Sequence, residues 1–183
     1  MRKRDHRRKK KVSLEQARCL ASPARTELLD ALGMVGEGSA HDLACITGLS
    51  VNTIHYHLDK LSEAGLVRKA GTRPTATKGE GLFRLRYERM GFDLKDKSIE
   101  YREAKSKAIR QSLNLALKES DLSLFSDHGM DGARHLRVSL KLSRKDLGEL
   151  RSRLVEVAEW ARARHDDECE PVSITALTVL KAP

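Results

Sequence analysis

The segment Cys45–Val67 limits what this chain can fold into more than any other part of the sequence. Gly48 can adopt the left-handed backbone conformation that ends a helix, and Ser50 can cap the helix that follows. Gly65 predicts the end of that second helix, and the apolar pair after it predicts the start of a strand. Two helices joined by so short a turn form a helix-turn-helix, whose second helix can enter the major groove of DNA.

The second helix of this motif is amphipathic. Its apolar residues recur at intervals of four and three, so they share one face that we expect to pack on the domain: Ile54, Leu58 and Leu61. The opposite face carries Asn52, Thr53, His55, Tyr56 and Asp59, with Lys60 near its edge. This polar face is the one that we expect to meet DNA.

The exposed residue types suggest how each would contact DNA. Asn52, His55 and Tyr56 can reach base edges, and Val51 can meet a thymine methyl group. Phosphate contacts are better suited to Ser50, Thr53 and Lys60. Basic residues after the helix are further candidates: Arg68, Lys69, Arg73, Lys78, Arg84 and Arg86. Because alternate strand positions point to opposite faces, only some of these six can face DNA.

Two helices precede the motif and a β-hairpin follows it. Ser22 and Pro23 predict the start of a helix over residues 24–32, and Ser39 with Asp42 forms a variant of a capping box before a short helix. Residues 66–70 and 82–87 are predicted strands. The residues between them are rich in turn formers, which predicts a long and mobile tip. The hairpin is the expected wing.

This arrangement resembles the ArsR-like winged helix-turn-helix transcriptional regulators. The matching residues are Ser22-Pro23-Ala24-Arg25, Leu28-Leu29, Leu49-Ser50, Thr53-Ile54, His57-Leu58, Leu61 and Glu63-Ala64-Gly65-Leu66-Val67. The resemblance covers roughly residues 14–88. It implies a prokaryotic homodimer that binds a palindromic operator and usually represses transcription. It also implies that His57 packs inward.

The positive charge of the chain is concentrated at its beginning. The formal net charge is +9, but eight of the first eleven residues are Lys or Arg. The remaining chain carries 27 basic and 25 acidic residues. Residues 1–11 are therefore a like-charge block that we expect to be disordered in isolation. Either this tail contacts DNA phosphates or a minor groove, or it is a solvated segment that only raises nonspecific affinity. Its candidate contacts are Arg2, Lys3, Arg4, Arg7 and Arg8.

The domain organisation changes after the wing. Residues 12–90 are the expected DNA-binding domain, and residues 91–122 hold one long helix, predicted over 95–119, that either packs within the chain or forms a dimer contact. Residues 133–183 are expected to form a small strand–helix–strand module, with strands at 135–142 and 172–180, that serves dimerisation or effector sensing. The predicted fold class is mainly α with small β-sheets (α+β).

The sequence shows no catalytic constellation, no paired metal ligands and no glycine-rich phosphate loop, so we expect no enzyme, no metal and no cofactor. No segment predicts a signal peptide or a membrane span, so we expect a cytoplasmic, nucleoid-associated protein. The expected function is a dimeric, sequence-specific DNA-binding regulator, with a small-molecule effector left open. The alternative is a winged-helix protein that binds other proteins, or nucleic acid without sequence preference, through its tail.

Overall fold

The computed structural model describes residues 10–75, 79–87, 89–124, 141–166, 169 and 172–178. The chain divides into two compact units, Met1–Leu115 and Ala116–Pro183. No helix of the described residues is long and apolar enough to cross a membrane.

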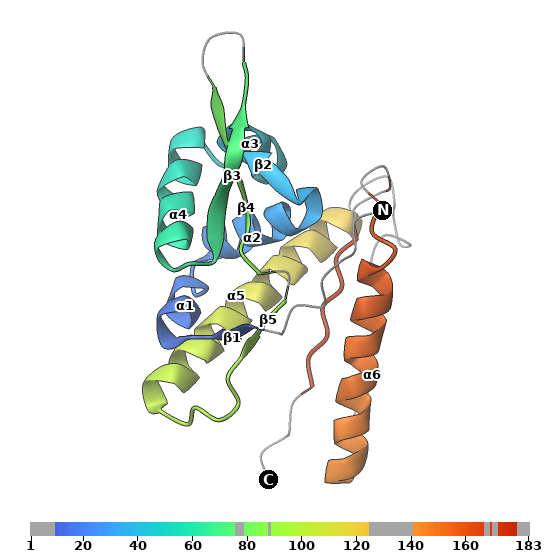
Figure 1. Cartoon of the computed structure of the whole chain (residues 1–183). Helices are drawn as coiled ribbons and strands as arrows, with labels where there is room; N and C mark the ends of the chain where they lie inside the picture. The colour runs from blue at the N-terminus through green and yellow to red at the C-terminus, as the bar shows by residue number, and fades with distance from the viewer. Residues whose placement is uncertain are drawn as a thin grey trace. The chain divides into compact units, whose positions relative to one another are not determined.

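The first unit contains a winged helix-turn-helix. Its helices and strands are, in chain order, α2 (Pro23–Val35), β2 (Glu37–Ser39), α3 (Ala40–Thr47), α4 (Val51–Glu63), β3 (Val67–Arg73) and β4 (Glu80–Leu85). The three strands form an antiparallel sheet in the order β2-β4-β3. In Figure 1 the β3–β4 hairpin projects beyond the helices as the wing. The predicted fold class is confirmed.

The core of this domain lies between the three helices and one face of the sheet. Its buried residues come from the three helices and from the chain of the β3–β4 hairpin: Leu28, Leu32, Leu43, Ile54, Leu58, Leu61, Leu66, Val67 and Phe83. The predicted apolar face of the second helix is therefore the buried face of α4. Since burying an aliphatic side chain contributes roughly 1.5–3 kcal/mol, this cluster dominates the stability of the domain.

The predicted start and end of α3 and the predicted start of α4 are confirmed, whereas α2 continues to Val35, three residues beyond its predicted end. Gly48 has φ +72° and ends α3, and the Ser50 hydroxyl accepts a hydrogen bond from the Thr53 backbone N–H at 3.2 Å. At the start of α3, Ser39 and Asp42 form a reciprocal capping box, in which each side chain accepts from the backbone N–H of the other residue. These caps satisfy backbone donors that a helix start leaves open, so they fix the turn between α3 and α4.

The wing is longer and its tip is shorter than predicted. The structure pairs Gly71 with Leu82, Thr72 with Gly81 and Arg73 with Glu80, so residues 71–73 and 80–81, which were expected to be in the loop, belong to the ladder. The register shifts between Lys69 and Gly71. A bulge of this kind lets the ladder continue through the turn-forming residues, and an ion pair between Arg73 and Glu80 holds its far end.

The first unit also contains a second, two-stranded sheet. β1 (Lys10–Val12) pairs in parallel with β5 (Met90–Phe92), and α1 (Leu14–Cys19) follows β1 with a capping box of its own. None of these elements was predicted. Lys10 and Lys11 therefore belong to a strand, which corrects the end of the expected tail. The connection after the wing also contains a strand.

The long helix α5 (Ile99–Leu124) begins four residues later and ends five residues later than predicted. Ala104 and Ala108 are buried, whereas Ile99 and Leu117 are exposed. The most deeply buried residue of the helix is Tyr101. Its hydroxyl donates to the Val12 carbonyl at 2.8 Å and accepts from the Asp93 N–H at 2.7 Å. This side chain therefore joins β1, β5 and α5.

The second unit contains α6 (Arg144–Arg162), the helix of the predicted module, which is capped by a hydrogen bond from the Asp146 N–H to the Ser143 hydroxyl. The strand predicted over 172–180 is wrong for residues 172–178, which have no strand structure. Val172, Ile174 and Leu177 are exposed, so the apolar side of the alternation is not buried among the described residues. The strand predicted over 135–142 lies mostly outside the described residues, and Lys141 and Leu142 are not in a strand.

Candidate nucleic-acid interface

The outward face of α4 is the centre of the candidate interface. Asn52, His55 and Tyr56 are exposed as predicted, with Tyr56 57% exposed. Val51 begins the helix and is 37% exposed. Asp59 lies on the same face and places one negative charge among these groups. The face thus offers an amide, an imidazole, a phenol and a carboxylate, all of which can read base edges.

All three residues of this segment that were expected to contact phosphate have partners within the protein. The Ser50 and Thr53 hydroxyls lie 2.8 Å apart and serve the cap of α4. Lys60 Nζ forms an ion pair with Glu63 Oε2 at 2.8 Å, and this contact raises the pKa of Lys60. Lys60 must leave Glu63 to reach a phosphate, which costs little because exposed ion pairs are weak.

His57 faces inward, as the family resemblance implies. Its Nδ1 atom is enclosed and has no hydrogen-bond partner. Burial lowers the pKa of His57, and the nearby charge of Arg25 lowers it further. The imidazole is therefore neutral at neutral pH, and its edge packs against the ring of Tyr56, with ring centroids 5.0 Å apart. This contact orients Tyr56 on the outward face.

The structure sorts the wing residues by face. Phe83 points to the core, and Lys69, its partner in the register, shares that side of the sheet while remaining exposed. Arg68 and Arg84 are paired with each other on the opposite, outer side, and both are exposed. Arg86 lies two residues after Arg84 and is also exposed. The six wing candidates therefore do not form one surface.

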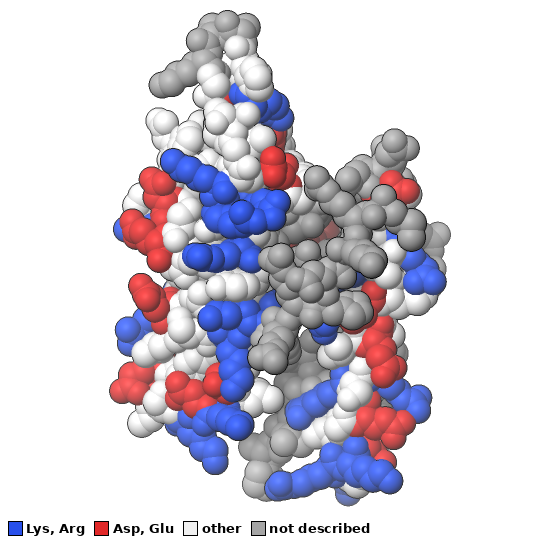
Figure 2. Space-filling model, viewed as in Figure 1, with Lys and Arg blue, Asp and Glu red and all other residues white. Residues whose placement is uncertain are grey.

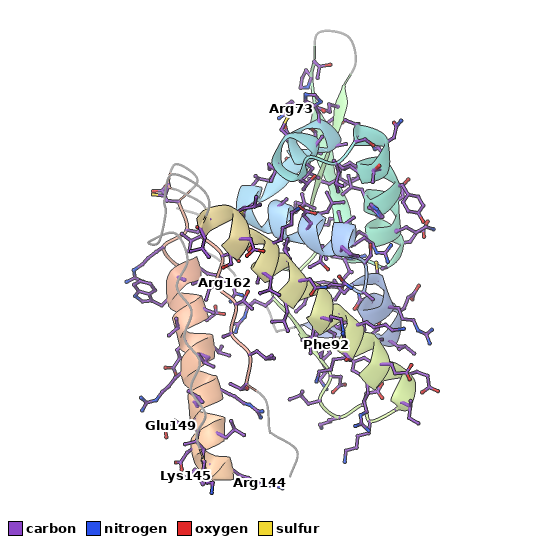
Figure 3. All side chains as sticks on the ribbon, turned by 180° about the vertical axis from the view of Figure 1, so that it is seen from behind. Arg73, Phe92, Arg144, Lys145, Glu149 and Arg162 are labelled. Carbon is purple, nitrogen blue, oxygen red and sulfur yellow. The ribbon has the colours of Figure 1, made fainter. Side chains whose placement is uncertain are left out.

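Arg73 has a different environment from the other wing cations. Its Nη2 lies 3.0 Å from Asp42 Oδ1 and 2.8 Å from Glu80 Oε2. The hydrogen bond from Arg73 lowers the pKa of Asp42 to about 2 and lowers that of Glu80 as well. Figure 3 shows Arg73 beside the wing and α3. This pairing favours a role in holding the wing over direct phosphate contact.

An open hollow of about 560 Å³ lies between the wing and the start of the recognition helix. Val51 and His55 line it from α4, and Ala40 and His41 from α3. The wing contributes Thr75, Gly79, Glu80 and Gly81. The N-terminus of α4 carries partial positive charge from its free backbone N–H groups, which favours an anion at this place. His41 was not predicted to belong to the interface, because it lies on α3 and the prediction considered α4 and the wing.

The tail candidates Arg2, Lys3, Arg4, Arg7 and Arg8 lie outside the described residues, and so does Lys78 of the wing. Lys10 and Lys11 are the described residues of the segment that was expected to be the tail. The backbone N–H of Lys10 donates to the Arg89 carbonyl at 3.0 Å, and Lys10 Nζ lies 5.5 Å from the centre of the Tyr87 ring. The tail therefore starts next to the end of β4.

Among the described residues, no group of three or more His, Cys, Asp or Glu side chains is placed to hold a metal ion. The three cysteines are all free thiols. The described site offers hydrogen-bonding and charged groups for recognition.

The helix-turn-helix, its core, and the wing beside it define a winged-helix DNA-binding domain. Comparison with protein families agrees with this class: residues 22–69 match the family described as "Bacterial regulatory protein, arsR family". The matched segment runs from the cap of α2 into β3, and it confirms the resemblance seen in the sequence. The match supports a DNA-binding transcription regulator.

No curated protein matches the chain. Among solved structures, the chain is similar to the homodimeric winged helix-turn-helix DNA-binding domain of a possible ArsR-family transcriptional regulator from Mycobacterium bovis. The two chains are 22% identical, the match covers 66% of this chain and 88% of the other, and the TM-score is 0.33. A TM-score this low supports no conclusion about shared function.

Proposed function

We propose that this protein is a sequence-specific transcriptional repressor that binds a palindromic operator as a homodimer. The recognition helix α4 lies in the major groove and reads bases through Asn52, His55 and Tyr56, with Val51 against a thymine methyl group. The observation that carries the proposal is the outward face of α4, where base-reading side chains stand exposed above an enclosed apolar core.

In this arrangement the phosphate backbone of DNA lies at the hollow beside α4. Free N–H groups at the start of the helix attract a phosphate, and the exposed Lys69 lies on the side of the wing that faces the helices. The wing tip then lies along the backbone or in the adjacent minor groove. The exposed recognition residues supply specificity, and these backbone contacts fix the register on the duplex.

The proposed homodimer follows from the two-fold symmetry of palindromic sites and from the exposed apolar residues of α5. Ile99, Leu117 and Leu122 are each more than 60% exposed. A helix of this length spans about 39 Å at 1.5 Å per residue, which is enough to form an extended contact with a second copy. Sedimentation analysis of the full chain and of a Leu117→Glu variant would test this role.

The experiment that tests the proposed function is selection of bound duplexes from a random DNA pool at near-physiological salt. The protein should be compared with a variant that lacks residues 1–9, because Lys10 and Lys11 belong to β1 and their removal would disturb the fold. Recovery of the same palindrome with both proteins supports a dimeric sequence reader. The lack of any enriched sequence with either protein contradicts it.

The second candidate is a winged-helix protein whose affinity for nucleic acid comes mainly from the basic tail. The observation that favours it is the charge distribution, since most of the net positive charge lies in the first eleven residues. This candidate predicts that binding collapses without residues 1–9 and that the Asn52→Ala variant binds as the unaltered chain does. The proposed repressor function predicts that the variant without residues 1–9 still binds, and that Asn52→Ala discriminates less well between DNA sequences.

A further inference from the structure

The outer face of the wing sheet carries an uncompensated row of arginines. Arg68 on β3 and Arg84 on β4 are direct partners in the antiparallel register, so their side chains leave the sheet about 5 Å apart on the same side. Like charges placed directly opposite destabilise a sheet. Neither side chain forms an ion pair with a described residue, although Glu37 is the partner of Arg84 on β2. Oxygen atoms of a bound anion would remove this repulsion.

The row continues beyond the strands. Arg86 follows Arg84 by two residues, and its backbone N–H donates to the Leu66 carbonyl at 2.9 Å, which holds it beside β3. Next comes Tyr87, with Lys10 over its ring. Figure 2 shows Lys and Arg side chains following one another over β3 and β4 on this face. The pairing of β3 with β4 and the contact of Lys10 with Tyr87 thus bring together basic residues from three parts of the sequence.

This surface is separate from the recognition helix. The opposite side of the same sheet carries Phe83 and Leu85, which pack in the core against the helices. The arginines of the outer row therefore point away from the helices, and the bases that α4 reads are not within their reach. A row of guanidinium groups in extended spacing suits a linear array of phosphates, because guanidinium forks bind phosphate oxygens in pairs.

We propose that Arg68 and Arg84 on the outer face of the wing sheet, with Arg86 after β4 and Lys10 of β1 beside Tyr87, bind the phosphate backbone of duplex DNA beyond the half-site that α4 reads. This inference rests on the proposed function and adds a second contact to it. Flanking DNA that bends toward the sheet gains these charged contacts, so affinity depends on the length of the duplex as well as on its sequence.

The test is the salt dependence of binding measured on two duplexes. One contains only the selected site, and the other extends it by about 10 base pairs, one helical turn, at each end. The variant is Arg68→Gln with Arg84→Gln in the full chain. On the extended duplex, the slope of log affinity against log salt should decrease by about 0.9 for each phosphate that the variant no longer neutralises. On the short duplex, the variant should match the unaltered protein.

Two further variants complete the test. Arg144→Gln with Lys145→Gln removes the same charge from exposed positions at the start of α6, labelled in Figure 3, and should leave the difference between the duplexes unchanged. Arg68→Lys with Arg84→Lys keeps the charge and should restore most of the slope. If the glutamine variant does not fold, replacing Arg84 alone by Gln should still lower the slope by about 0.9.

The outcomes separate this inference from the proposed function. Equal slopes for the glutamine variant and the unaltered protein on the extended duplex overturn the inference, even where a palindrome is recovered. An effect of equal size on both duplexes also overturns it, because the arginines would then contact the half-site itself. If the glutamine variant no longer binds an acidic protein but keeps the DNA slopes of the unaltered protein, the outer face is a protein-binding surface. The absence of any sequence preference contradicts the proposed function, whatever the slopes show.

Discussion

Arg73 Nη2 lies 3.0 Å from Asp42 Oδ1, so a residue of the wing is joined to the first turn of α3. Asp42 also accepts a hydrogen bond from the Ser39 backbone N–H at 2.9 Å, so the same carboxylate caps α3. The partner on the other strand, Glu80, lies 2.8 Å from the same guanidinium nitrogen. One arginine therefore connects the hairpin to the helix-turn-helix and sets the position of the wing.

Replacing Arg73 by Gln should loosen the wing with little effect on global stability. The ion pairs are exposed, and such pairs contribute little to the free energy of unfolding. We expect faster amide hydrogen exchange at residues 71–73 and 80–82, weaker DNA binding and an unchanged preferred sequence. Arg73→Lys is the control. It keeps the positive charge, so its amide exchange and its DNA binding should change less than those of Arg73→Gln. Unchanged exchange at these amides would show that the ladder alone holds the wing.

The pairing of Asp42 predicts a loss of stability in acid. Its pKa in the folded state is about 2, below the ordinary value of 3.8, because Arg73 and the Ser39 N–H stabilise the charged form. This contribution to the free energy of unfolding is complete above pH 3.8 and disappears as the pH falls toward 2.

Urea denaturation at pH 5 and at pH 2.5 would measure this loss in the unaltered protein and in Asp42→Asn. The asparagine keeps a carbonyl oxygen that can cap α3, but it has no charge to lose. The variant should therefore show a smaller decrease in stability between the two pH values. An equal decrease in both proteins would assign the acid sensitivity to other carboxylates, such as Asp93, whose pKa is also lowered.

Replacing Asn52 by Ala should reduce sequence discrimination and leave the fold intact. The side chain is exposed at the start of α4, and a good paired contact to a base contributes about 1–3 kcal/mol of discrimination. Competition between the selected site and single-base variants would locate the base pair at which preference disappears. Uniform weakening at every position would instead assign Asn52 to the backbone.

Replacing Tyr101 by Phe should destabilise the junction of β1, β5 and α5. The hydroxyl satisfies the Val12 carbonyl and the Asp93 N–H, and the side chain is 1% exposed. Leaving buried polar groups without partners costs about 1–3 kcal/mol, which chemical denaturation can measure. Tyr87→Phe is the matched control, since its ring contact with Lys10 survives the loss of the hydroxyl. Equal stability of both variants would contradict this role.

The features predicted well from the sequence depend on neighbours within a few residues. Ser50 caps α4 three residues away, and Ile54, Leu58 and Leu61 form its buried face by helical spacing alone. The recognition face was accessible to prediction for the same reason, because it is what remains when the buried face is known.

The features that were missed depend on residues far apart in the chain. β1 and β5 are short and have no alternating pattern, and they become strands only by pairing with each other. Arg73 was counted as a free cation because its partner Asp42 lies 31 residues away. The division of the wing arginines into two faces needed the register, which the bulge after Lys69 shifts. At residues 172–178 an apolar alternation is present, but these residues form no strand with any described part of the chain.

The parallel pairing of Lys10–Val12 with Met90–Phe92 has a consequence for the order of folding. A contact between residues so distant in sequence carries a large loop-closure cost, whereas the helix-turn-helix and the hairpin close locally. The central helices and the wing can therefore form first, and β1 docks last. In the native state this three-residue strand should also be among the first parts to open, which makes attachment of the N-terminal segment an equilibrium separate from global unfolding.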